Sequence, residues 1–127
     1  PRVNPDATHV YYVYGMTLDI KLLGVEREWI CSALKAEGVT GLFAGYQNIH
    51  LLPLFQNKIA YGVSGFPWKG LKKPESTVSY EKGLCPVAEQ LHDEMFLGLN
   101  LCAHNFDNEQ VDQVVSAFHK VWFSIGG

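Results

Sequence analysis

Three side chains that can hydrogen bond to a ligand lie close together in the sequence, on Tyr46, Asn48 and His50. Pro53 follows, and it prevents the stretch from continuing as a regular helix because its backbone nitrogen has no hydrogen to donate. The phenol, the amide and the imidazole together offer donors and acceptors for hydroxyl groups. We expect Tyr46 and His50 to line one cleft, the alternative being simple packing. Asn48 either binds a ligand hydroxyl or closes an Asx turn.

A second set of residues further along the chain could also contact a ligand. Trp68 can stack on a sugar or a base, or it can pin its own loop through packing. A nearby lysine cluster could meet a nucleotide diphosphate, although such a cluster is usually a solvated surface; it consists of Lys69, Lys72 and Lys73. The predicted substrate-binding residues are Tyr46, Asn48, His50 and Trp68.

The composition limits the class of protein. The chain has 127 residues, of which 47% are hydrophobic and 18% charged, and this suits one compact domain. The net charge of -3 provides no basic surface for nucleic acid. No apolar run reaches the roughly 20 residues that span a bilayer, and the first residues do not resemble a signal peptide. We expect a cytoplasmic protein that binds neither nucleic acid nor membrane.

The cysteines form no metal-binding or disulfide pattern. Cys31, Cys85 and Cys102 are odd in number and lack CxxC spacing, so we expect reduced thiols. Cys102 and His104 could supply only two metal ligands, fewer than a structural site needs. We predict no metal site.

Sequence periodicity predicts the elements of the first third of the chain. Residues 1–8 form a polar lead-in or linker, and residues 9–19 a long, largely buried strand, because alternate residues are apolar. A helix is predicted over residues 26–37, and Gly38 is placed to end it in a left-handed conformation. The expected buried stripe of this helix is Trp29, Ile30, Ala33 and Leu34.

The middle of the chain combines a short strand, a long loop and a helix. Residues 39–44 are predicted to be a strand that leads to Tyr46. Residues 56–84 show no sustained period, but their aromatic residues favour an ordered flap over a solvated linker. A helix is predicted to begin at Pro86. Its expected buried face is Val87, Ala88, Leu91 and Met95.

The remaining elements complete the predicted fold. Residues 97–101 form a predicted short strand, and a long helix follows Asp107, which with Gln110 forms a capping box. This order of elements predicts an α+β domain over residues 9–127, with a small, mainly antiparallel sheet and helices packed on one face.

Several motifs, in order along the chain, resemble the C-terminal small domain of the DegT/StrS family of pyridoxal-phosphate-dependent sugar aminotransferases. The motifs are HVYYVY at 9–14, LKAEGV at 34–39, GYQNIHLLPLF at 45–55, CPVAEQL at 85–91 and the helix at 107–122. Two positions depart from the family pattern. Many members have histidine where this chain has Gly45, and proline where it has Asn48.

The resemblance implies a fold like that of the small C-terminal domain of type I aminotransferases. It implies that pyridoxal phosphate and its Schiff-base lysine belong to a large domain of the complete enzyme, which is the expected partner. We therefore expect this chain alone to bind no cofactor and to be inactive. The implied acceptor is a keto sugar, nucleotide-linked and used for polysaccharide or glycosylated-metabolite biosynthesis, with glutamate as the amino donor. The small domain would cap the cleft and position the sugar.

A second function stays open at this point. The chain could be a stand-alone domain, derived from the same family, that binds a small ligand or a protein without catalysis. A domain separated from its larger partner would leave an apolar docking face uncovered. The flap residues Tyr61, Phe66 and Trp68 would either cover this face or mediate self-association, so we expect weak oligomerisation, with a homodimer as one assembly.

Overall fold

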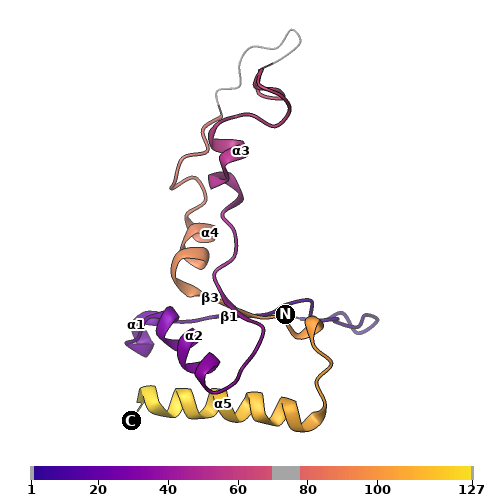
Figure 1. The fold of residues 1–127 in the computed structure, drawn as a ribbon, viewed down its shortest axis with the longest axis vertical. Helices are drawn as coiled ribbons and strands as arrows, with labels where there is room; N and C mark the ends of the chain where they lie inside the picture. Colours follow the sequence, from indigo (N-terminus) through magenta and orange to yellow (C-terminus); the bar gives the residue numbers. More distant parts are fainter. Residues whose placement is uncertain (1, 70–77, 127) are drawn as a thin grey trace. The chain divides into compact units, whose positions relative to one another are not determined.

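The computed structural model describes residues 2–69 and 78–126. The fold is α+β with a small antiparallel sheet, as predicted (Figure 1). The chain divides into two compact units, residues 1–46 with 93–127 (unit 1) and residues 47–92 (unit 2). The prediction of a single domain over residues 9–127 stays a prediction.

Unit 1 contains a three-stranded sheet and the longest helices. Its strands are β1 (Tyr14–Thr17), β2 (Leu42–Ala44) and β3 (Phe96–Leu99). Its helices are α1 (Ile20–Leu23), α2 (Arg27–Ala36), the 3-10 turn η3 (Leu101–Ala103) and α5 (Asn108–Gly126). The strand order is β1-β3-β2, and both pairings are antiparallel, with Tyr14 and Leu42 each opposite Leu99. The predicted strand at 97–101 is therefore confirmed, and it is the central strand.

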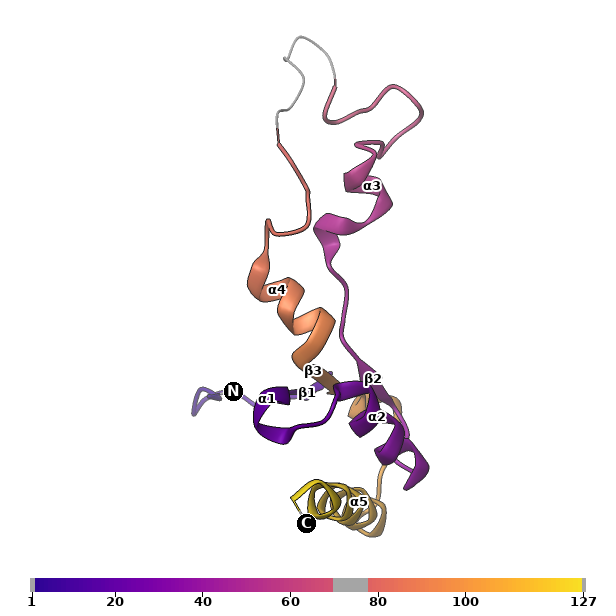
Figure 2. The ribbon, with the colours of Figure 1, turned by 90° about the vertical axis from the view of Figure 1, so that its left-hand side faces the viewer.

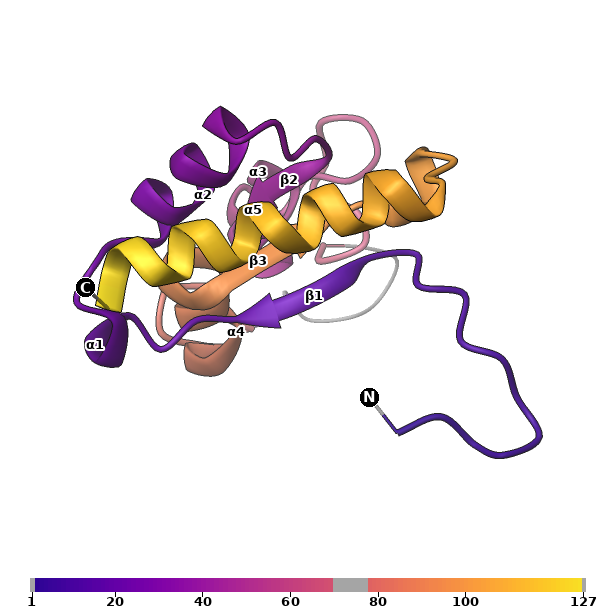
Figure 3. The same cartoon turned by 90° about the horizontal axis from the view of Figure 1, so that it is seen from below.

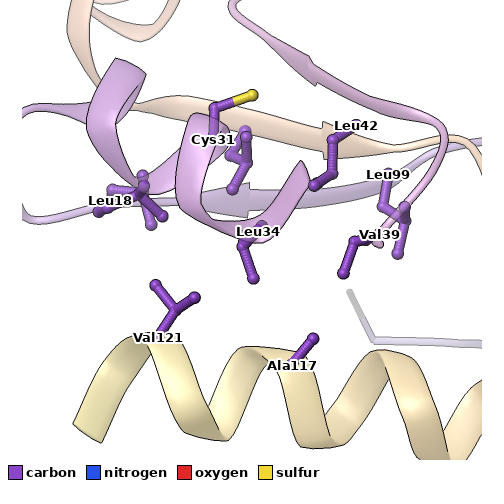
Figure 4. Packing of buried hydrophobic residues seen from close by; sticks show 10 residues of the cluster. Leu18, Cys31, Leu34, Val39, Leu42, Leu99, Ala117 and Val121 are labelled. Atoms are coloured by element: carbon purple, nitrogen blue, oxygen red, sulfur yellow. The ribbon is translucent and has the colours of Figure 1, made fainter. Parts of the chain in front are cut away.

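The core of unit 1 lies between the sheet and two helices on the same side of it, α2 and α5 (Figure 2). Ile30, Leu34 and Leu97 are completely buried at its centre. Figure 4 shows Leu34 of α2 pointing toward α5, where Ala117 and Val121 face it. The prediction of helices packed on one face is confirmed.

Helix α2 ends as its sequence predicts. Gly38 has a φ of 91°, and the N–H groups of Gly38 and Val39 donate to the carbonyls of Lys35 and Leu34. This is a Schellman motif, which satisfies carbonyls left over at a helix end. One residue of the predicted stripe is wrong, because Trp29 is exposed rather than buried.

A buried cation joins the start of α2 to the start of β3. The guanidinium of Arg27 donates to the carbonyls of Asp93 at 3.0 Å and Phe96 at 3.4 Å. It also binds Glu28, and this hydrogen bond lowers the pKa of the Glu28 carboxyl. The helical pattern gave no sign of this role, because arginine in a first helical turn is expected at the surface.

The predicted strand over residues 9–19 is wrong in length and burial. Only Tyr14–Thr17 is strand, and Val10 and Tyr12 are 77% and 70% exposed. Tyr11 has a φ of 46°, and its N–H donates to Nδ1 of His9 at 2.9 Å. This left-handed residue breaks the extended conformation that the alternating pattern requires.

Unit 2 is built from short helical segments. They are η1 (Ile49–Leu51), α3 (Pro53–Gln56) and α4 (Pro86–Gln90), and the π-helical turn η2 (Leu91–Met95) connects α4 to β3. Pro86 begins α4, as predicted, but the predicted buried face is only partly correct, with Leu91 and Met95 half-buried. Val87 and Ala88 are exposed and Glu89 is buried, because α4 has only five residues and its acidic side chain turns back toward the preceding loop.

Helix α5 begins with the predicted capping box. The N–H of Gln110 donates to Oδ1 of Asp107 at 2.8 Å, and the N–H of Asp107 donates to Oε1 of Gln110 at 3.0 Å. Two donors that would otherwise lack a partner at the helix start are thus satisfied. The helix runs nearly along the direction of β1 and β3 (Figure 3).

Candidate functional site

The candidate site in unit 2 contains a buried pair of ionisable side chains, His50 and Glu89. Nε2 of His50 lies 2.8 Å from Oε1 of Glu89, and both side chains are about nine-tenths buried. His50 sits in η1, which forms because Pro53 ends one helical turn and begins the next at its first position, where a missing N–H costs no hydrogen bond. The contact joins two segments that are 39 residues apart in sequence.

Glu89 also fixes the loop before α4. Its two oxygens accept from the N–H of Gly83 at 2.8 Å each, and Oε1 accepts from the N–H of Cys85 at 3.1 Å. Burial alone would raise the pKa of Glu89, but the hydrogen bonds from Gly83, Cys85 and His50 outweigh it and hold the pKa below its usual value. Glu89 is therefore an anion at neutral pH that organises the entrance to α4.

Gln56 closes a second loop of the same unit. Its side-chain N–H group donates to the backbone carbonyls of His50 at 2.8 Å and of Tyr80 at 2.6 Å. The segment of η1 is thereby tied to the far end of the flap. The sequence pattern did not predict Gln56 or Glu89 as residues of the site. For Glu89, the one feature that favoured a structural role was its position in the first turn of a helix, where an acidic side chain is stabilising.

Asn48 is the polar residue of the site whose bonding is incomplete. It is 5% exposed, and within the described part of the chain neither Oδ1 nor Nδ2 has a hydrogen-bond partner. No side-chain hydrogen bond closes the Asx turn that sequence offered as an alternative, and its backbone carbonyl instead accepts from Leu51. A buried amide without partners is unfavourable by about 1–3 kcal/mol, so a ligand group able to reach it would be bound strongly.

Tyr46 is the exposed member of the predicted set. It is 63% exposed, and its ring lies 6.3 Å from the ring of Phe43 in unit 1. His50 and Asn48 belong to unit 2. The expected convergence of Tyr46 and His50 on one cleft stays a prediction.

Trp68 belongs to an aromatic cluster within the flap. Its ring packs edge-on against Phe55 and Tyr80, and its Nε1–H donates to the Tyr80 hydroxyl at 2.9 Å. The indole is buried, so it pins its own loop. A stacking role for Trp68 stays a prediction, and Lys72 and Lys73 lie outside the described residues.

A hollow of about 300 Å³ lies beside this cluster. It is lined by Phe55, Gln56, Lys58, Val78, Ser79, Tyr80 and Glu81. A small pocket that combines ring faces with a few polar groups suits a polar organic ligand.

Over residues 2–69 and 78–126, no three histidine, cysteine or acidic side chains cluster so as to hold a metal ion. In the same ranges, no helix has the length and apolar character needed to cross a membrane.

The chain is similar to a curated protein whose name states a biosynthetic process. It shares 31% identity over 67 residues with the spore coat polysaccharide biosynthesis protein SpsC of Bacillus subtilis (strain 168). The match covers 53% of this chain and only 17% of the relative. No family model matches the chain, and no solved structure matches it significantly.

Proposed function

We propose that this chain acts as the sugar-positioning small domain of a pyridoxal-phosphate-dependent aminotransferase in polysaccharide biosynthesis. The acceptor is a keto sugar linked to a nucleotide, and glutamate supplies the amino group. The observation that carries the proposal is the 31% identity over 67 residues with a polysaccharide biosynthesis protein. The resemblance of residues 9–122 to the DegT/StrS small domain supports the reaction class.

The cofactor is assigned to another part of the enzyme. A lysine that forms a Schiff base is activated by desolvation or a nearby cation. Lys58 is half-buried and the other described lysines are exposed. These side chains do not fit a cofactor site, so no chemical step is assigned to this chain.

The chain instead contributes geometry to the acceptor site. Asn48 brings an amide whose donors and acceptor have no partner among the described residues, which is the bonding capacity that a sugar hydroxyl can fill. The His50 and Glu89 pair holds η1, which Asn48 immediately precedes, against the loop before α4. Holding a reactant in one orientation lowers the activation barrier without any proton transfer by the residues that hold it.

The test uses the complete protein that contains this chain, loaded with pyridoxal phosphate. Purified enzyme is incubated with glutamate and a panel of nucleotide-linked keto sugars, and amino sugar and 2-oxoglutarate are measured by mass spectrometry. We expect stoichiometric formation of both with at least one sugar of the panel. An enzyme that transfers the amino group only to keto acids would contradict the proposal.

A second measurement tests where the cofactor lies. The 127-residue chain is mixed with pyridoxal phosphate, and the absorbance of a Schiff base is followed during dialysis. We expect no stoichiometric band. A retained band that one lysine substitution abolishes would place the cofactor in this chain and contradict the assignment.

A further inference from the structure

Unit 1 has an apolar groove along one side of α5. It has a volume of about 570 Å³ and is lined by β1, β3 and α5, with side chains that include Tyr14, Met16, Leu99, Val111, Val115 and Trp122. Val111 and Val115 are exposed in it, although they continue the apolar stripe of the helix. The stripe of α5 therefore extends beyond the part of the sheet that covers it.

The groove borders the open edge of the sheet. In the described residues β1 pairs only with β3, so one of its edges has no strand partner. The N–H of Leu18 donates to Met95, and alternate residues of an antiparallel strand face the same neighbour, so Met16 and Tyr14 also face β3. The backbone groups of Gly15 and Thr17 point to the open edge, ready to pair with a further strand.

A strand-forming segment of this same chain pairs with no strand of the described residues, and its carbonyls at Val10 and Tyr11 accept from the Cys102 thiol at 3.2 Å each. Residues 9–13 precede β1 and have the alternating pattern of a strand, yet Val10 and Tyr12 are exposed. Figure 3 shows the chain leaving β1 toward the N-terminus and running away from α5. Tyr11 is in the left-handed region, which is unfavourable for a tyrosine, so an extended conformation of this segment would relieve that strain.

We infer that the open edge of β1 binds residues 9–13 of a second copy of this chain, and that each copy fills the other's α5 groove. The two strands run antiparallel about a two-fold axis at Val13. In this register Tyr12 of one copy lies opposite Tyr14 of its partner, and Val10 lies opposite Met16. Tyr14 and Met16 line the groove, and residues of the same parity share a face of a strand. Val10 and Tyr12 of the second copy therefore enter the groove.

The hydrogen-bonding pattern agrees with the same register. Gly15 and Thr17, whose backbone groups point outward, fall opposite Tyr11 and His9 of the second copy, and Val13 falls opposite itself. This single register therefore places the apolar side chains in the groove and also pairs the backbone groups that point to the open edge. The contact is isologous, as two-fold dimers require.

The apolar area is sufficient for such a dimer. Five large side chains would be covered in each copy, and they are Val10, Tyr12, Tyr14, Val111 and Val115. Each exposes on the order of 100 Å², so the pair of copies would bury about 1,000 Å² of side-chain surface, near the lower limit of a specific interface. This pairing between two copies is independent of the proposed aminotransferase function, which involves unit 2 and an additional domain.

The first test is the oligomeric state of the 127-residue chain without cofactor or sugar. Sedimentation equilibrium is measured for the native chain and for Val10→Asp, Tyr12→Asp and Val63→Asp. Val63 is 97% exposed in unit 2 and is the matched control, because it receives the same charge away from the groove. We expect a reversible dimer whose dissociation constant rises at least about tenfold in the first two variants and is unchanged in the control.

The second test examines the register. In the proposed dimer the two Val13 Cα atoms lie about 5.5 Å apart, within the range of Cα separations that a disulfide spans. The Cys102 thiol lies 3.2 Å from the carbonyls of Val10 and Tyr11, so both variants are made with the exposed Cys85 and Cys102 replaced by serine. Val13→Cys should then form a cross-linked dimer under mild oxidation faster than Val63→Cys.

Three results would overturn the inference. They are a strict monomer at millimolar concentration, a dimer that Val10→Asp and Tyr12→Asp leave intact, and cross-linking at Val13→Cys no faster than at Val63→Cys. Val115→Asp on α5 tests whether the groove is filled, independently of pairing at the edge of β1. It should also weaken the dimer, and a dimer of unchanged affinity would contradict the filling of the groove.

Discussion

Nε2 of His50 lies 2.8 Å from Oε1 of Glu89, and Glu89 at the same time accepts from the N–H groups of Gly83 and Cys85. One carboxylate therefore holds both η1 and the start of α4. The imidazole and the loop are organised by a charge that the surrounding protein largely covers, so the local order of unit 2 depends on Glu89 staying ionised.

Glu89→Gln is expected to loosen this network. The new side-chain NH₂ group would replace an acceptor and face the N–H of Gly83, where two donors repel each other. Hydrogen exchange of the Gly83 and Cys85 amides should accelerate roughly tenfold. Glu81→Gln, an exposed change in the same segment, is the matched control, and equal exchange in the two variants would contradict a specific role for Glu89.

The order of unit 2 is expected to depend on acid pH. Because the folded pKa of Glu89 lies below its ordinary value of 4.5, its contribution to stability is fully present above about pH 4.5. The contribution is lost as pH falls through the lower folded pKa, when the carboxyl takes up a proton. Exchange rates of the Gly83 amide in the native chain and in Glu89→Gln, corrected for intrinsic rates, should approach each other as the pH falls below 4.5 and Glu89 takes up a proton. A difference that stays constant until the chain unfolds in acid would contradict the assignment.

Gly98→Ala tests the close packing at the centre of the sheet. A Cβ at residue 98 would lie 2.3 Å from the ring of Phe43, so the ring must move, and it packs against Phe96 and Tyr46. We expect a loss of about 1–3 kcal/mol in the free energy of unfolding, measured by urea denaturation. Gly126→Ala has open space and should change stability little. Equal stability of the two variants would show that Phe43 moves without cost.

Asn48→Leu is expected to stabilise the free chain. The leucine removes two buried polar atoms that have no partner in residues 2–69 and 78–126, so the chain should gain about 1–2 kcal/mol in the free energy of unfolding. Asn100→Leu, at a half-buried asparagine of unit 1, serves as the comparison for the change of side chain alone. A destabilised Asn48→Leu chain would mean that the amide has partners in the free protein, contrary to the site described above.

Local signals predicted the elements that local interactions determine. The end of α2 at Gly38 and the capping box of Asp107 and Gln110 involve residues within a few positions of each other, so the sequence displays them directly. The length of β1 was not predictable from alternation, because the left-handed conformation of Tyr11 interrupts a pattern that would otherwise continue. The sequence alternates between apolar and polar residues as a strand would, but the φ angle of Tyr11 ends the extended conformation at that residue.

The sequence drew attention to the segment of the candidate site but did not predict its contacts, and the role of the segment stays a prediction. Tyr46, Asn48 and His50 stood out because a phenol, an amide and an imidazole fall within five residues, shortly before Pro53. Glu89 did not, since an acid in a helical turn is ordinarily exposed, and its burial depends on a histidine 39 residues away. Such long-range pairings are set by the folded arrangement, and no single period contains them.

The central claim is that this chain positions the acceptor sugar and takes no part in the chemistry of the amino donor. Stopped-flow spectroscopy of the complete, cofactor-loaded enzyme measures its two half-reactions separately, with glutamate and with the keto sugar. For Asn48→Leu and Tyr46→Phe, and for the more disruptive His50→Ala, we expect weaker sugar binding by about 1–3 kcal/mol and an unchanged glutamate half-reaction. Variants that slow the glutamate half-reaction as severely as the sugar half-reaction would contradict the claim.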